Sequence, residues 1–210
     1  MITELKSREI SQTVDHIAAR WARPDKSILK QVFPLLASGQ PLTEEQIIEV
    51  TGANHSNVRE ALSLGRTGRD EQGHVIELFG VTKTTTSHRI EINQTILYSC
   101  CALVAHMVPM LTGGTARIES TDPISKESVW VTIRDHTLES FTPMDATGTF
   151  VSTEFREVMD SVGDAFCNHI MHFSSIENAQ EFIAQNPKRF ILNMEEFHDI
   201  AIKMYEAIWT

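Results

Sequence analysis

Apolar residues spaced by about one helical turn predict two helices at the start of the chain. The first stripe is formed by Leu5, Ile10, Val14, Ile17 and Trp21. The sequence RPDK at 23–26 interrupts the pattern. The second stripe is formed by Ile28, Leu29, Val32, Leu35 and Leu36. Both patterns predict helices that bury one face in a common core.

Capping signals predict a third helix over residues 42–52. Pro41 and Thr43 open the segment, and Gln46 follows Thr43 by three residues, the spacing of a capping box. Gly52 supplies the residue type that commonly ends a helix.

The next segments predict a short helix followed by a hairpin. Val58 and Leu62 fall on one face of a fourth helix, and a turn around Gly73 leads into strand-like runs that end with HRIEIN at 88–93. Helices followed by a hairpin are the element order of a winged helix-turn-helix, here spanning about residues 26–93. We therefore expect a helical module resembling a winged helix-turn-helix in residues 1–93.

The remainder, residues 94–210, predicts an α+β core in which helices pack on a small mixed or antiparallel sheet. Residues 94–111 are largely apolar and predict a helix that Pro109 kinks or ends. Residues 152–173 mix a short helix with a run that fits either helix or strand. The clearer elements are a strand at 127–135, a helix at 174–187 beginning at a serine N-cap, a short strand at 190–193 and a closing amphipathic helix at 194–209 whose inward residues are Phe197, Ile200, Met204 and Ile208.

Composition is that of an ordinary globular protein, with 41% hydrophobic and 22% charged residues. No apolar run reaches the roughly 20 residues that a membrane span requires, and the N-terminal residues lack the apolar stretch of a secretory signal. Only three cysteines occur, too few for a paired disulfide framework. These features predict a cytoplasmic protein without a membrane partner.

Nucleic acid is an unfavourable partner because the net charge is −10. The segment that would act as a recognition helix carries Arg59, Arg66 and Arg69 but also Glu60. Specific DNA binding requires many phosphate contacts in addition to base contacts. We therefore favour a packing role for this module over that of a DNA-binding transcription regulator.

The cysteines are the main candidates for chemistry. On a helix, Cys100 and Cys101 would project about 100° apart, so at least one of them is expected to be a buried core residue. Thiols from distant segments that converge favour soft, thiophilic metals. The spacing of structural zinc sites is absent. A papain-like pair of a cysteine with His169 lacks the sequence context expected around the nucleophile.

Two stretches resemble the organomercurial (alkylmercury) lyases. The central motif of that family is similar to LYSCCALVAHMVPMLTGGTARIES at 97–120, and its Phe-Cys-Cys-His segment is similar to AFCNHIMHF at 165–173. The resemblance covers nearly the whole chain. It implies that Cys101 and Cys167 are the catalytic, metal-binding cysteines, with Cys100 an additional neighbour. Tyr98 matches a family tyrosine near the site.

The family's chemistry is carbon–mercury bond cleavage by protonolysis. The resemblance implies that two thiolates bind an organomercury substrate, a positioned acid protonates the leaving carbon, and Hg²⁺ stays on the sulfurs. No cofactor is implied beyond Hg²⁺ as bound product. Cytosolic thiols or a mercuric reductase are the implied acceptors of that product, in the context of mercuric resistance.

The sequence departs from the family where the third catalytic group, an aspartate, is replaced by Val104. His106 is a poor substitute because it lies roughly 140° around a helix from Cys101. His169 shares a face with Cys167 if that segment is a strand, as a base or further ligand, and is otherwise a structural histidine. Binding of metal is therefore expected to be preserved better than cleavage. A non-catalytic or weakly active binder of thiophilic metals or organometals is the alternative.

Overall fold

The computed structural model describes residues 4–40 and 42–210, so the predicted role of Pro41 lies outside the described residues. The fold is α+β, with antiparallel strands as expected. Its helices are α1 (Glu4–Arg20), α2 (Lys26–Ala37), α3 (Glu44–Thr51), α4 (His55–Leu64), α5 (Ala102–Thr112), α6 (Phe155–Asp160), α7 (Val162–Ala165), α8 (Ile176–Ile183), α9 (Met194–Trp209) and the 3₁₀ turn η1 (Cys167–His169). Its strands are β1 (Thr67–Arg69), β2 (Val75–Leu78), β3 (Val81–Thr82), β4 (His88–Ile92), β5 (Thr95–Ser99), β6 (Thr115–Thr121), β7 (Ser128–Arg134), β8 (Thr137–Thr142), β9 (Thr147–Val151), β10 (His172–Phe173) and β11 (Arg189–Asn193).

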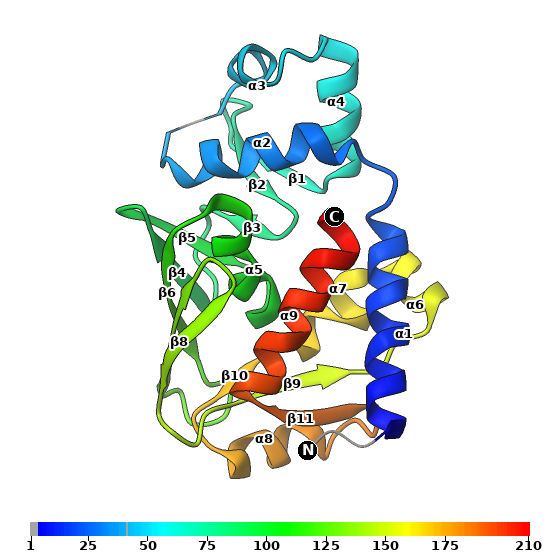
Figure 1. Cartoon of the computed structure of the whole chain (residues 1–210), viewed down its shortest axis with the longest axis vertical. Coiled ribbons are helices and arrows are strands. Elements are labelled where there is room, and N and C mark those ends of the chain that lie inside the picture. Colours follow the sequence, from blue (N-terminus) through cyan, green and yellow to red (C-terminus); the bar gives the residue numbers. More distant parts are fainter. Residues whose placement is uncertain (1–3, 41) are drawn as a thin grey trace.

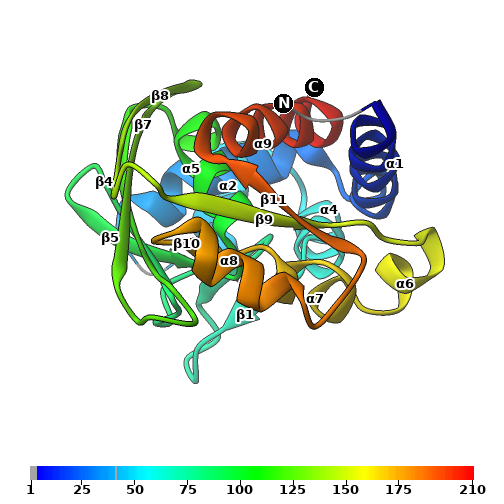
Figure 2. The same ribbon diagram turned by 90° about the horizontal axis from the view of Figure 1, so that it is seen from below.

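The strands form two sheets. The larger is eight-stranded in the order β1-β2-β3-β5-β4-β6-β7-β8, and the smaller has the order β10-β9-β11. Helix α9 lies between the two sheets and contacts α5, α1, β9 and β11 (Figures 1 and 2). The boundary predicted at residue 93 falls in the turn from β4 to β5, and the large sheet contains strands from both sides of it.

The N-terminal stripes predict the helices well. In α1 the side chains of Ile10, Val14 and Ile17 are buried, but Leu5 is 67% exposed, so its assignment to the core was wrong. Leu5 lies in the first turn of α1, and its side chain is exposed although the same turn lies against β11, where Lys6 packs on Phe190.

The local signals of the third helix are confirmed. Thr43 and Gln46 form the capping box, and Gly52 ends α3 in the left-handed conformation with φ 65°. Val58 and Leu62 are buried on one face of α4, as expected.

Residues 94–111 do not form a single helix. Residues 95–99 form β5, which pairs with both β3 and β4, and α5 begins only at Ala102. The alternation of buried Leu97 and Ser99 with the partly exposed Ile96 is the strand pattern that the apolar composition concealed. The helix does not end at Pro109 but continues to Thr112.

The C-terminal elements agree with the sequence patterns. Ser175 is the N-cap of α8. Residues 152–173, which fitted either helix or strand in part, form α6, α7, η1 and the short strand β10. All of the residues predicted to face inward from the closing helix are buried: Phe197, Ile200, Met204 and Ile208.

Within the described ranges, no helix combines the length and the apolar composition needed to cross a lipid bilayer.

A cluster of buried histidines lies where α5, α9 and the sheets meet. His88 Nδ1 and His172 Nδ1 each lie 2.9 Å from Ser120 Oγ, and His106 Nδ1 lies 3.3 Å from His198 Nδ1. Burial lowers the pKa of His88 from 6.5 to about 4 and lowers the pKa of His106 and of His172 well below the usual value. These rings are therefore neutral in the folded protein at neutral pH.

This cluster predicts a loss of stability in mild acid. Because the folded-state pKa lies below the unfolded value, the unfolded chain binds more protons, and stability falls as the pH drops from about 6.5 toward 4. For His88 alone the full pKa difference corresponds to about 3–4 kcal/mol. Urea unfolding between pH 7 and pH 5 should show this slope. The slope should flatten in His106→Leu and stay unchanged in His55→Asn, which alters an exposed histidine. A slope unaffected by His106→Leu would contradict the assignment.

Candidate active site

Cys100 and Cys101 occupy the connection between β5 and α5. Cys101 is the N-cap of α5 with φ −157° and ψ 163°, and the Cys100 N–H donates to the Gly80 carbonyl oxygen at 2.8 Å. Neither residue is in a helix, so the expected divergence of about 100° does not apply. That expectation was wrong because it depended on a helix spanning residues 94–111.

Cys167 comes from the opposite side of the pocket, at the first position of η1. A backbone hydrogen bond from Ala102 N to Ile170 O, 3.1 Å long, holds the start of α5 against this segment. The Sγ atoms of Cys100 and Cys167 lie 3.7 Å apart, and the ligand atoms of all three cysteines lie within 4.8 Å of one another. All three thiols are free. The fold therefore brings Cys101 and Cys167 together and adds Cys100 to them.

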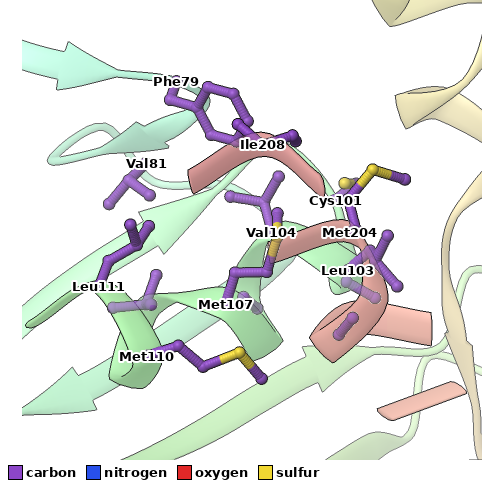
Figure 3. Close-up of a cluster of buried hydrophobic side chains, with 14 of the residues drawn as sticks. Phe79, Val81, Cys101, Leu103, Val104, Met107, Met110, Leu111, Met204 and Ile208 are labelled. Atoms are coloured by element: carbon purple, nitrogen blue, oxygen red, sulfur yellow. The ribbon is translucent and has the colours of Figure 1, made fainter. Parts of the chain in front are cut away.

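The three thiols line a small apolar pocket. Its other lining residues are Ile17, Trp21, Arg66, Phe79, Leu103, Val104, Met107, Val162, Phe166, Met204 and Ile208. The cavity volume is about 30 Å³. Figure 3 shows Val104 among Met107, Met204 and Ile208, close to Cys101.

Val104 lies three residues after Cys101, so both line the same side of the pocket. Among the described residues that line it, none carries a carboxylate. The pocket thus places an apolar side chain at the position where the resemblance implies an acid.

The thiols differ in proton affinity. Hydrogen bonds from Cys100 and from Cys101 lower the pKa of Cys167 well below its usual value, and Arg66 adds to this effect. Cys101 forms hydrogen bonds to Cys100 and to Cys167. Together with burial, these hydrogen bonds raise the pKa of Cys101. The hydrogen bond with Cys101 is the largest single effect on Cys100 and lowers its pKa, but the hydrogen bond with Cys167, burial and the Cys167 charge together raise that pKa above its ordinary value. The cluster therefore favours one thiolate, on Cys167, between two thiols.

Arg66 is the positively charged residue of the pocket lining. It follows α4 in the left-handed conformation, with φ 56°, and its charge lowers the pKa of both Cys100 and Cys167. The other two arginines of the same segment are used elsewhere. Arg59 and Arg69 both form ion pairs with Glu44, at 2.9 and 2.7 Å.

The remaining candidate residues lie outside this pocket. Tyr98 is on β5 between the buried Leu97 and Ser99, so it faces the other side of the strand. His169 is in η1 and not in a strand, and its Nδ1 accepts hydrogen bonds from Arg189 Nε at 3.0 Å and Nη at 2.7 Å. It lines a separate surface hollow.

Several pocket residues were not identified from the sequence. Trp21, Phe79 and the pair Met204 and Ile208 of α9 come from three distant segments, and periodicity assigns Trp21, Met204 and Ile208 only to a general core. Arg66 was considered only as a DNA contact. No local motif of the sequence indicated its place at the thiols.

Comparison with known proteins places this chain in a family. The alkylmercury lyase family model (MerB) matches residues 81–206. The chain is 31% identical over 198 residues to an alkylmercury lyase of Staphylococcus epidermidis, covering 92% of this chain and 87% of the relative. It is 30% identical over 176 residues to an alkylmercury lyase of Bacillus cereus, covering 83% and 79%.

The fold also matches a solved structure, the mercury-bound form of MerB2, with a TM-score of 0.73 and 20% identity over 96% of this chain and 99% of that one. The match at this identity supports the shared fold, and the sequence matches support the membership. The chain belongs to the alkylmercury lyases, an enzyme family.

Proposed function

We propose that this protein is an organomercurial lyase that cleaves a carbon–mercury bond by protonolysis, with Cys101 and Cys167 as its metal-binding thiols. The observation that carries the proposal is the cluster of thiols, within 4.8 Å of one another, on the wall of an apolar pocket. Thiolates bind mercury as soft ligands, and the apolar lining suits an organic group.

Substrate binding begins at Cys167. Hydrogen bonds from its two neighbours and the charge of Arg66 favour its thiolate form. The thiolate displaces the counter-ligand X⁻ from R–Hg–X, which forms a sulfur–mercury bond and leaves R–Hg on Cys167. Val104, Met107 and the other apolar side chains of the lining then surround the organic group.

Cleavage requires a proton at the carbon. The Cys101 thiol retains its proton because its pKa is raised. As the carbon–mercury bond breaks, its electron pair takes the Cys101 proton to give R–H, and the Cys101 sulfur binds mercury. Atoms and charge balance without a carboxylate. Turnover should be slower than with a general acid, which typically contributes about 10²–10⁴-fold.

The pocket size favours small organic groups. A cavity of about 30 Å³ accommodates a single methyl-sized group. A phenyl group requires displacement of flexible side chains, for which Met107 and Met204 are suited. Methylmercury and phenylmercury are therefore both appropriate substrates for assays.

The product Hg²⁺ is proposed to leave by exchange to cytosolic thiols or to a mercuric reductase. Three free cysteines are compatible with a reducing cytoplasm. A thiolate attacking from solvent would enter beside Arg66, which lines both this pocket and the adjoining surface hollow.

The N-terminal helices are proposed to form a degenerate winged helix that completes the pocket. Arg66 and Phe79 come from this segment and line the site. A transcription regulator is disfavoured because Glu44 pairs with Arg59 and Arg69 and Arg66 faces the thiols. The remaining rival is a binder without turnover, favoured only by Val104.

Hydrocarbon release tests the proposal. Reduced protein should release methane from methylmercury, or benzene from phenylmercury, faster than the same thiol buffer without protein. Headspace gas chromatography measures both products. If hydrocarbon is released no faster than in the buffer, cleavage by the protein is refuted. The remaining interpretation is then a protein that binds organomercury without turnover.

A further inference from the structure

Cys100 is held in a defined position beside the two thiols of the proposed reaction. Its backbone N–H donates to Gly80 O, and its Sγ lies 3.7 Å from the Sγ of Cys167. Gly80 has φ 77°, and a Cβ at that position would overlap the Cys100 sulfur. The turn between β2 and β3 therefore leaves space that the Cys100 side chain occupies.

The spacing of the three sulfurs fits a three-coordinate metal. With metal–sulfur bonds of about 2.3 Å, as in zinc thiolates, three ligands in a trigonal plane lie about 4 Å from one another. In the structure the sulfur–sulfur spacing is 3.7 Å for one pair and at most 4.8 Å for all three. Little movement is needed for one ion to contact all three sulfurs.

We propose that Cys100, Cys101 and Cys167 together form a three-sulfur site for inorganic Hg²⁺ and similar soft cations, with Cys100 as the third ligand. The proposal rests on the proposed function, which supplies Hg²⁺ as product. Each new sulfur–mercury bond replaces a sulfur–hydrogen bond, and the proton passes to a base in solvent. Three thiolates and Hg²⁺ carry a net charge of −1, which Arg66 in the pocket lining offsets.

The number of sulfur ligands can be measured directly. Reduced protein loaded with one equivalent of Hg²⁺ should show three sulfurs by X-ray absorption and the charge-transfer absorption of a three-coordinate mercury thiolate. Cys100→Ser should reduce the number to two. It should also weaken retention against a competing dithiol by about tenfold or more, or ~1.4 kcal/mol.

A matched pair of glycine variants tests the geometry without removing a thiol. Gly80→Ala should displace Cys100 and reduce the three-sulfur signal. Gly73→Ala imposes a similar backbone cost, since its φ is 85°, but has open space around the added Cβ and should leave the signal intact. Thermal melts of both variants report folding, and Cys100→Ser keeps the proposal testable if Gly80→Ala does not fold.

Two sulfurs in the wild-type protein, or three in Cys100→Ser, would overturn the inference. Two sulfurs together with hydrocarbon release would leave the proposed function standing. Three sulfurs without hydrocarbon release would support the site and refute the proposed cleavage.

Discussion

Serine in place of Cys167 is expected to abolish hydrocarbon release from methylmercury and phenylmercury. Cys167 is the thiol whose pKa the cluster lowers, so it is the sulfur that first binds R–Hg. A hydroxyl is a hard ligand that mercury binds poorly. Cys101→Ser should be equally inactive, because it removes both the proton and the second sulfur. Each variant should be assayed under the conditions that give measurable wild-type release.

The neighbouring residue offers a matched control. Asn168 lies in the same 3₁₀ turn as Cys167, is exposed, and donates a hydrogen bond to Asp164 rather than facing the thiols. Asn168→Ser should therefore release hydrocarbon at the wild-type rate. Full activity in a folded Cys167→Ser protein would remove this cysteine from the mechanism.

Aspartate in place of Val104 is expected to raise the rate of hydrocarbon release by about 10²-fold or more, within the usual range for general acid catalysis. Val104 lines the pocket three residues after Cys101, where a carboxyl group would reach the thiols. The apolar lining would raise the pKa of the new carboxyl group, which favours the protonated form that donates. Single-turnover rates with phenylmercury measure the gain directly.

Asparagine at the same position is the matched control, because it has nearly the same shape as aspartate and no ionisable proton. Val104→Asn should release hydrocarbon no faster than the wild type. Equal rates for the two variants would show that an acid at this position does not reach the reacting carbon. Because Val104 is only 7% exposed, both variants should lose stability, which urea unfolding can compare.

The sequence predicts most elements with strong periodicity or capping. The capping box at Thr43 and the inward face of α9 agree with the structure because local spacing determines both. The prediction of one helix over residues 94–111 was wrong because apolar composition alone does not distinguish a buried strand from a helix. Pairing with β4, which precedes it across a tight turn, and with β3 fixes residues 95–99 as a strand.

That single error had a consequence for the site. In the expected helix Cys100 and Cys101 projected about 100° apart, whereas in the connection between β5 and α5 both sulfurs lie near Cys167. The convergence of residues 100–101 with Cys167 could be predicted only from the family resemblance. Arg66 could not be placed at all, because its position depends on how the N-terminal helices pack on the core.

The most direct test of thiol-only cleavage is a single turnover with one equivalent of phenylmercury and excess reduced protein. We predict close to one equivalent of benzene, measured by gas chromatography, with the mercury retained on the protein as Hg²⁺. Phenylmercury that remains intact on the protein, and is recovered unchanged after denaturation, would contradict the account and identify a binder.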